Sequence, residues 1–288
     1  MASSLTPAQS HVHQLDHGHS HGHDHSHGHD HTHASVGQIN AAHFDQHVAG
    51  PTGMAGLFAK MYDVIESGLL ARQKELGLIE RSGREQDASK QPFRLLDYAC
   101  GGGHFSKFLL PYVDEAVGMD VSGKSVEAYN DWARENGHGE GKMAAYQANL
   151  METDVVTGLG NAGDEKFRDF DLIILIMALH HVTDPELLVR KLAQRLRKGS
   201  GKLVVVDWDE EGCTLPEIKK NWATRQAESK FGAVRQGFAE EEMSGWLRGA
   251  GGCTEISYEI LDGYKAAGNV FMASGRAGAN TNGASSVI

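Results

Sequence analysis

From Phe93 onward, short apolar runs alternate with amphipathic stretches, and this alternation is the feature that most restricts the fold. Strands that are separated by a helix pair in parallel, because each connection has to cross over the sheet. The pattern predicts strands at 93–98, 115–119, 143–147, 170–176, 201–206, 254–261 and 269–274, and helices at 105–112, 122–135, 185–196, 215–230 and 239–249. We therefore expect an α/β fold with a seven-stranded, mainly parallel sheet and helices on both faces.

The composition predicts one large domain between two tails. The chain has 288 residues, 40% of them hydrophobic, which is enough for one substantial core. Residues 1–40 contain little that could be buried, so we expect a disordered His-rich tail there. Residues 41–275 form the predicted domain, with an amphipathic helix at 54–76 that caps the fold, and residues 276–288 form a flexible tail.

The charge and the cysteines exclude several classes of protein. A net charge of −11 and a pI near 5.8, without clusters of Lys and Arg, argue against nucleic acid as a partner. No run of 18 apolar residues occurs, so we expect a soluble protein without membrane contacts. Cys100, Cys213 and Cys253 are few and far apart, which favours a reducing compartment, the cytoplasm or the nucleus. Whether the chain is a monomer or a homodimer stays open.

A glycine-rich turn follows the first predicted strand. The strand ends in Asp97, the turn contains Gly101 and Gly103, and a helix follows at once. Such a turn brings backbone N–H groups to the carboxyl edge of the sheet, where ligands of doubly wound folds bind. The next strand ends in Asp120, and a carboxylate at that position can accept hydrogen bonds from both hydroxyls of a ribose. The two features together indicate a cofactor that contains adenosine.

A nicotinamide cofactor fits this turn less well. A dinucleotide fingerprint that starts at Gly101 requires Gly or Ala at position 106, and the sequence has Ser106. The Tyr-x-x-x-Lys pair of many hydride-transfer enzymes does not occur in the chain. The sequence therefore disfavours a dehydrogenase.

Four motifs in the expected order resemble the class I S-adenosylmethionine-dependent methyltransferases. They are LLDYACGGGHFS, AVGMDVS, YQANL and the long segment from DFDLIILIMALHHV to GKLVVVD. Over residues 93–276 the chain resembles in particular the small-molecule group that includes the ubiquinone/menaquinone-biosynthesis methyltransferases. The resemblance implies the class I fold, S-adenosylmethionine as cofactor, and cofactor-binding roles for Asp97, Ala99, Gly101, Gly103, Asp120 and Asn149.

Two of these residues depart from the family's pattern. Ala99 stands where the family usually has its first glycine, and Asn149 stands where an acidic residue often contacts the adenine amino group. Alanine is small, and the amide oxygen of Asn149 can still accept a hydrogen bond from an amine. Met119, Val121 and Leu150 are candidates to enclose the adenine, with plain core packing as the alternative.

His180 and His181 are the candidate catalytic bases. They follow the predicted strand at 170–176, which puts them at the same sheet edge as the cofactor, and imidazole titrates near neutral pH. The alternative is that they cap or pack at the strand end, and His104 is a further candidate. The N-terminal helix and residues 209–237 are expected to select the acceptor, with an apolar pocket formed by Tyr62, Trp208, Trp222 and Phe231.

The N-terminal segment is rich in histidine. Flexible imidazoles can gather around a transition metal such as Zn, Ni or Cu without a preformed geometry. The candidate ligands are His11, His13, His17, His19, His21, His23, His25, His27, His29, His31 and His33. A solvated, low-complexity tail is the alternative interpretation.

The expected function is methyl transfer to an O, N or C atom of a small-molecule metabolite. One alternative is a metal-binding or metal-responsive protein in which a methyltransferase-like domain serves as a binding module. A protein methyltransferase is a second alternative, although MALHHV stands where an Asn/Asp-Pro-Pro-Tyr motif would be expected.

Overall fold

The structure is a computed structural model of the chain. It describes residues 35–47, 55–81, 91–153, 155–156, 160–161, 165–216, 219, 233–249, 251–263 and 267–279. The described residues belong to one compact unit, Ala34–Ile288. The His-rich segment and most of the helix predicted at 215–230 lie outside the described residues.

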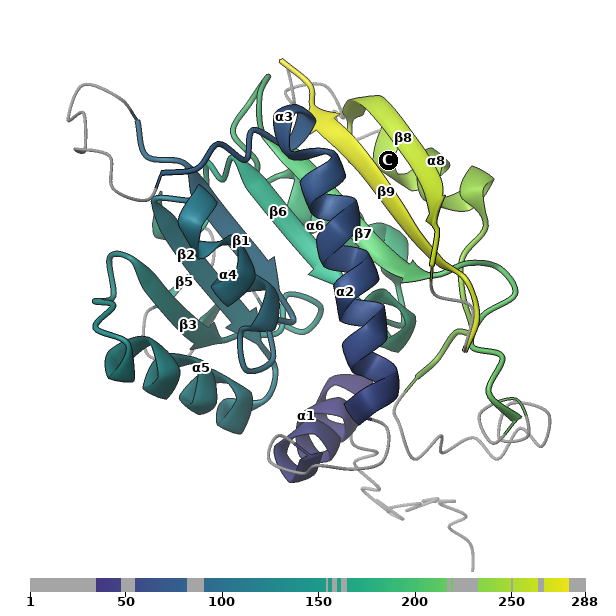
Figure 1. Cartoon of the computed structure of the whole chain (residues 1–288), viewed down its shortest axis with the longest axis horizontal. Coiled ribbons are helices and arrows are strands. Elements are labelled where there is room, and N and C mark those ends of the chain that lie inside the picture. The colour runs from purple at the N-terminus through teal and green to yellow at the C-terminus, as the bar shows by residue number, and fades with distance from the viewer. Residues whose placement is uncertain are drawn as a thin grey trace, which may run out of the picture. The chain divides into compact units, whose positions relative to one another are not determined.

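A seven-stranded sheet forms the centre of the unit (Figure 1). Its order is β3 (Met143–Gln147), β2 (Glu115–Asp120), β1 (Arg94–Tyr98), β6 (Leu172–Ile176), β7 (Lys202–Trp208), β9 (Val270–Ala277) and β8 (Cys253–Leu261). The first five of these strands pair in parallel, and β9 runs antiparallel to both β7 and β8. The predicted α/β class and the seven-stranded, mainly parallel sheet are confirmed. A two-stranded ribbon, β4 (Val155–Val156) with β5 (Gly160–Asn161), was not predicted.

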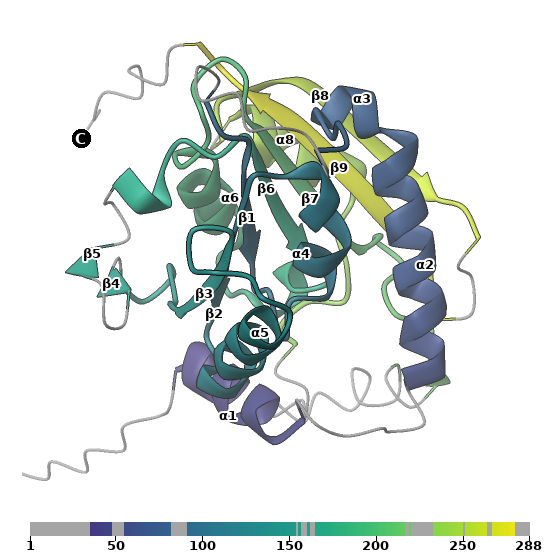
Figure 2. The same cartoon turned by 60° about the vertical axis from the view of Figure 1, so that its left-hand side comes forward.

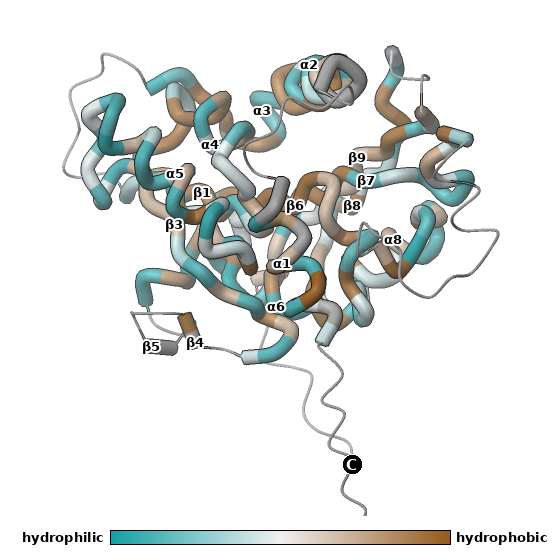
Figure 3. The backbone as a smooth tube through the Cα atoms, turned by 90° about the horizontal axis from the view of Figure 1, so that it is seen from below, coloured by the Kyte–Doolittle hydropathy of each residue, from teal (hydrophilic) through white to brown (hydrophobic). Residues whose placement is uncertain are grey.

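Helices cover both faces of the sheet (Figures 2 and 3). One face carries α2 (Ala55–Ala71), α4 (His104–Leu109) and α5 (Gly123–Glu135), and the other carries α6 (Pro185–Ala193) and α8 (Glu240–Arg248). Alternate residues of a strand point to opposite faces. On β1, Leu95 therefore joins the core cluster of α2, whereas Leu96 joins the cluster of α6.

Short elements complete the described part. They are α3 (Gln73–Leu76) and the 3-10 helices η1 (Leu110–Tyr112), η2 (Glu165–Phe167) and η3 (Leu179–His181). The predicted helix at 54–76 is thus found as α2 and α3, with Arg72 between them. No helix among the described residues is long and apolar enough to cross a membrane.

The start of α6 follows from its sequence. Asp184 is the N-cap, and its Oδ1 accepts a hydrogen bond from the Leu187 N–H at 3.0 Å. Pro185 occupies the first helical position, where its missing N–H leaves no hydrogen bond unmade. The helix predicted at 185–196 therefore begins at its predicted residue.

The predicted boundaries of the domain need correction at both ends. Helix α1 spans Val36–His47, so the expected disorder of residues 1–40 is wrong for residues 36–40. This helix is stabilised by tertiary contacts, mainly with α5, rather than by a strong apolar pattern of its own. At the other end β9 continues to Ala277, so Arg276 and Ala277 belong to the sheet and not to the predicted tail at 276–288.

Candidate functional site

The glycine loop after β1 is a tight turn at the carboxyl edge of the sheet. Three of its residues adopt positive φ: Ala99 at 60°, Gly101 at 52° and Gly103 at 83°. The Gly103 N–H donates to the Cys100 carbonyl at 2.8 Å, and the Cys100 N–H donates to the Met119 carbonyl at 3.1 Å. Ala99 therefore adopts a left-handed conformation that favours glycine, at the cost of strain.

The three glycines of the loop have different surroundings. A Cβ at Gly103 would lie 2.5 Å from Cδ2 of Tyr129, so this position requires glycine for packing as well as for φ. A Cβ at Gly101 or Gly102 would meet no atom within 4 Å. The backbone of the loop thus faces open space at these two residues, which fits the close approach of a ligand.

Asp120 fastens the end of β2 to the loop. Its Oδ2 accepts a hydrogen bond from the Gly101 N–H at 2.8 Å, and its Oδ1 accepts one from the Ser122 N–H at 2.8 Å. Burial raises the pKa of this carboxyl group, and these hydrogen bonds oppose the increase. Each oxygen accepts one of these bonds and keeps a further lone pair, which can accept a hydrogen bond from a hydroxyl group.

Asp97 lies beneath the loop. Its Oδ2 accepts a hydrogen bond from the Ser106 hydroxyl at 2.8 Å, and the side chain is buried. Burial raises its pKa from 3.8 to about 7, with the Ser106 hydrogen bonds acting in the opposite direction and Asp120 adding a smaller increase. The carboxyl group therefore changes charge near neutral pH.

Asn149 follows β3 and lies against α1. Its Oδ1 accepts a hydrogen bond from the Met151 N–H at 3.1 Å. The backbone of α1 comes so near that a Cβ at Gly37 would overlap Nδ2 of Asn149. Met119 and Leu150, two of the candidates to enclose an adenine, are fully buried in the core, whereas Val121 is half-buried.

His180 forms a pair with Asp207, a residue that the sequence analysis did not single out. Nδ1 of His180 lies 2.8 Å from Oδ1 of Asp207, and the His180 N–H donates to Oδ2 of the same carboxyl group at 3.1 Å. The Asp207 side chain is completely buried, and that of His180 is 13% exposed. Asp207 comes near the end of the apolar strand β7, which is the same signal that identified Asp97 and Asp120 at the ends of their strands.

The remaining candidates have other partners. The ring of His181 is tilted by 40° against that of His180, with centroids 4.2 Å apart, and meets Phe44 of α1 edge to face at 5.3 Å. Nε2 of His104 lies 2.8 Å from Oε1 of Glu66 on α2.

The predicted acceptor pocket is only partly described. The ring of Tyr62 contacts that of His104 in a tilted arrangement, with 4.5 Å between the centroids. Trp208 is buried in the core. Trp222 and Phe231 lie outside the described residues, so the pocket stays a prediction.

The described residues contain no group of three His, Cys, Asp or Glu side chains that could hold a metal ion. The predicted ligands, His11 to His33, all precede the first described residue.

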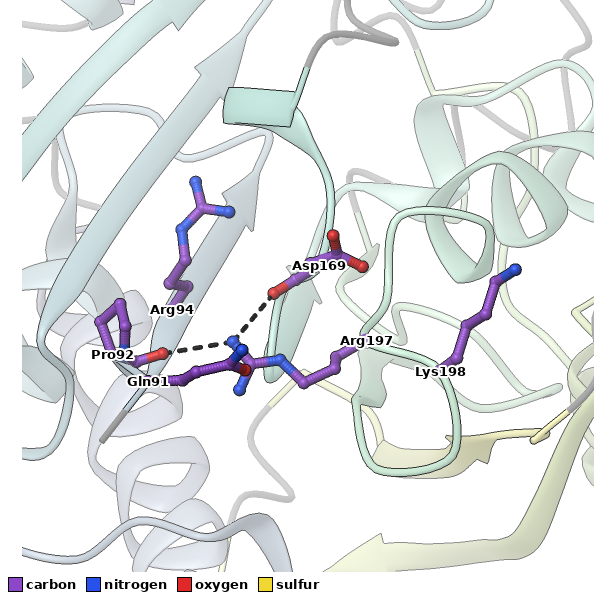
Figure 4. A pocket seen from close by; sticks show the side chains of 6 residues that line it. All are labelled: Gln91, Pro92, Arg94, Asp169, Arg197 and Lys198. Atoms are coloured by element: carbon purple, nitrogen blue, oxygen red, sulfur yellow. Dashed lines mark hydrogen bonds between the residues drawn. The ribbon is translucent and has the colours of Figure 1, made fainter. Parts of the chain in front are cut away.

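A surface hollow of about 490 Å³ lies at the opposite edge of the sheet (Figure 4). It is lined by Gln91, Pro92, Arg94, Asp169, Arg197 and Lys198, which are placed at or before the amino ends of β1, β6 and β7. Its arginines already have acidic partners, Glu115 at 2.6 Å for Arg94 and Asp171 at 2.8 Å for Arg197. We therefore assign the chemistry to the carboxyl edge, where the loop and the paired histidine lie.

Comparisons with known proteins decide the family. A family model described as a methyltransferase domain matches residues 70–251. The chain belongs to this methyltransferase family. The resemblance to class I S-adenosylmethionine-dependent methyltransferases that the motifs predicted is thereby confirmed.

Curated methyltransferases are similar in sequence to part of this chain. An uncharacterized methyltransferase of Schizosaccharomyces pombe is 37% identical over 127 residues, which is 44% of this chain and 42% of the relative. A ubiquinone biosynthesis O-methyltransferase of Idiomarina loihiensis is 28% identical over 154 residues, 54% of this chain and 51% of the relative. The chain thus spans about half the length of the curated relatives it matches.

Solved structures show the same fold. The magnesium protoporphyrin IX methyltransferase of Synechocystis PCC 6803 with bound SAM superimposes with a TM-score of 0.55 at 14% identity. The match covers 85% of this methyltransferase and 99% of that chain.

Proposed function

We propose that this protein is an S-adenosylmethionine-dependent methyltransferase that acts on an O, N or C atom of a small-molecule metabolite. One observation carries the proposal: the Gly101 N–H is bound to Asp120 beside a loop that faces open space at Gly101 and Gly102. The family match adds that residues 70–251, which include this loop and Asp120, belong to a methyltransferase domain. When bound at this edge, S-adenosylmethionine supplies an electrophilic methyl group on a sulfonium centre.

The residues present fit this cofactor. Asp120 offers acceptor positions for ribose hydroxyls, and the loop at Ala99, Gly101 and Gly103 offers a close backbone approach. Asp97 adds a buried carboxyl group below the loop for the amino-acid end, and Asn149 adds an amide for the adenine end. These assignments are proposals that a binding experiment can test residue by residue.

We assign the removal of the acceptor's proton to His180. Hydrogen bonding of Nδ1 to Asp207 leaves Nε2 as the nitrogen that can take a proton, and it fixes the plane of the ring. His181 packs against the rings of Phe44 and His180, so we give it a packing role. Asp207 acts through His180 and is a positioning residue.

A small molecule is the acceptor class that the relatives support. Several of the curated matches are named ubiquinone biosynthesis O-methyltransferases. An acceptor that is methylated on oxygen presents a hydroxyl group, from which a base removes the proton. The acidic balance of this chain, −11 overall, agrees with an acceptor other than nucleic acid.

The proposal is tested by incubating the protein with methyl-labelled S-adenosylmethionine and a metabolite extract from its own source. We expect label in a small-molecule fraction, and we expect the His180→Ala variant to transfer far less. Label in the protein fraction alone would favour a protein methyltransferase. No transfer into any fraction by a folded protein that binds the cofactor would contradict the proposal.

The eleven histidines between His11 and His33 support a second property, the binding of a transition metal by the N-terminal segment. The metal-responsive alternative makes that property the main function. Because α1 begins at Val36, a deletion of residues 1–33 removes the histidines and spares the helix. Loss of Zn binding with unchanged methyl transfer would separate the two properties, and unchanged Zn binding would refute the second. The described structure has no disulfide among Cys100, Cys213 and Cys253, which agrees with our inference of a cytoplasmic or nuclear location.

A further inference from the structure

Helix α1 passes across the carboxyl edge at which we place the cofactor. Near its C-terminal end, Oδ1 of Asp45 accepts hydrogen bonds from the Ser122 hydroxyl at 2.5 Å and from the Lys124 N–H at 3.2 Å. Near its N-terminal end, Gly37 lies against Asn149. Figures 1 and 2 show α1 beside α5 at the edge toward which the parallel strands point. The helix therefore spans from the end of β2, where Asp120 lies, to the end of β3.

Asn40 lies in the middle of this span and is buried, with 7% of its surface exposed. Its Nδ2 donates a hydrogen bond to the His181 carbonyl at 3.2 Å, whereas its Oδ1 has no hydrogen-bond partner in the described structure. The orientation of the amide is fixed by chemistry, because a carbonyl oxygen can accept only from the NH2 group. The atom that remains without a partner is therefore an acceptor.

A buried acceptor without a donor is costly, and native structures rarely keep one. The cofactor that we propose for this edge carries suitable donors in its adenosine half, namely the adenine amino group and the two ribose hydroxyls. We assigned Asp120 to the ribose and Asn149 to the adenine. One end of α1 contacts Ser122, two residues after Asp120, and the other end lies against Asn149. Asn40 lies between these two contacts along the helix.

We propose that Asn40 is a cofactor-binding residue whose Oδ1 accepts a hydrogen bond from the adenosine half of S-adenosylmethionine. The inference rests on the proposed function, since it requires that the cofactor binds at this edge. It adds a third side to the adenosine site: β2 and β3 supply two sides from the sheet, and α1 supplies one from the N-terminal segment. Asn40 also joins the cofactor to the backbone of η3, because its Nδ2 holds the carbonyl of His181, next to the proposed base.

The test is a calorimetric titration with S-adenosylhomocysteine and its analogues. We expect Asn40→Ala to bind S-adenosylhomocysteine about ten-fold more weakly than the wild type, the typical effect of one lost hydrogen bond in a buried site. The matched control is Ile39→Ala, because Ile39 is the neighbour on the same helix and is 45% exposed. We expect this control to bind as the wild type does.

Analogues identify the donor and separate binding from folding. One analogue carries a carbonyl oxygen in place of the adenine amino group, and two others lack the 2′- or the 3′-hydroxyl. One of these analogues lacks the group that donates a hydrogen bond to Oδ1 of Asn40. We expect the wild type to bind that analogue more weakly than S-adenosylhomocysteine, and Asn40→Ala to bind the two with equal affinity. A purely structural role of the Nδ2 contact with His181 would weaken all ligands by the same factor. Asn40→Leu, which keeps the volume, replaces Asn40→Ala if the latter does not fold.

Each outcome of these titrations either supports or overturns the proposed role of Asn40. Loss of discrimination against one analogue supports the proposal, whichever donor it identifies. Equal weakening of every ligand, or unchanged affinity in both Asn40 variants, overturns it while leaving the proposed function intact. Failure of the wild type to bind S-adenosylhomocysteine would instead overturn the proposed function.

Discussion

Nδ1 of His180 lies 2.8 Å from Oδ1 of Asp207, and the carboxyl group of Asp207 is completely buried. The same carboxyl group accepts hydrogen bonds from the backbone N–H groups of His180 and Trp208. It thereby fixes both the ring and the main chain of His180 at the carboxyl edge. A histidine with this support is oriented for one task, because only Nε2 remains to exchange a proton with a bound molecule.

We predict that His180→Asn lowers the rate of methyl transfer by about 100-fold or more, the usual contribution of a positioned general base. The dissociation constant for S-adenosylhomocysteine should change little, since His180 is assigned to the acceptor. Single-turnover rates and calorimetry with the same protein sample provide the two numbers. If the variant transferred methyl groups at the wild-type rate, His180 would be a packing residue and the assignment would fail.

The loop glycines offer a matched pair of substitutions. Gly103→Ala should destabilise the fold by about 2 kcal/mol or more, because its Cβ would lie 2.5 Å from Tyr129 at a φ of 83°. Gly102→Ala has open space and no positive φ, so its stability should stay within about 0.5 kcal/mol of the wild type. Urea unfolding measures both.

The second half of that comparison concerns binding. We expect Gly102→Ala, although fully stable, to bind S-adenosylhomocysteine about ten-fold more weakly, because the new methyl group occupies the space in which a ligand approaches the backbone. Unchanged affinity would mean that the ligand does not contact this side of the loop.

At Ala99 we expect a substitution to raise the stability of the fold rather than lower it. Its φ of 60° costs an L-residue about 1–2 kcal/mol, while glycine costs about 0.5–1 kcal/mol in unfolded-state entropy. Ala99→Gly should therefore stabilise the protein by about 0.5 kcal/mol, and Ala99→Val should destabilise it, because a β-branched side chain tolerates this conformation less. A lower midpoint of urea unfolding for Ala99→Gly than for the wild type would show that Ala99 is not strained.

Asp97 should make stability depend on pH. Its pKa is raised from 3.8 to about 7 in the fold, so the folded state holds a proton that the unfolded chain has lost. Stability is then highest below the unfolded pKa, falls as pH rises, and levels off above about pH 7. Between pH 5 and pH 8 this loss amounts to about 3 kcal/mol, and Asp97→Asn should abolish it. Unfolding curves of the two proteins at both pH values measure the difference, and parallel curves would contradict the raised pKa.

Much of the fold could be predicted from the sequence because local patterns determine it. The apolar runs placed the strands of the main sheet within two residues of their observed ends, except that β9 continues three residues beyond its predicted end. The helix predicted to begin at residue 185 does begin there, as α6. The strand β7 reaches Trp208, beyond the predicted end, because Asp207 and Trp208 pair with β9, and strand pairing leaves no local pattern.

The candidate site was predictable where its residues terminate strands, and less so elsewhere. Asp97 and Asp120 end apolar strands beside the glycine turn, so their position at one edge followed from the topology. Asn40 and Asp45 belong to α1, whose residues show little helical periodicity and whose contacts join segments far apart in the chain. The partner of His180 was missed because the importance of Asp207 depends on a contact between β7 and the 3-10 helix η3, two segments that are separated in the sequence.

The most direct test of the whole account is a calorimetric titration of the wild type and of Asp120→Ala with S-adenosylmethionine. We predict that the wild type binds one equivalent of the cofactor and that Asp120→Ala, shown to be folded by its thermal transition, binds at least ten-fold more weakly, because it has lost the acceptor for the ribose hydroxyls. No binding by the folded wild type, or equal binding by the variant, would contradict the assignment of the cofactor to the edge formed by Gly101 and Asp120.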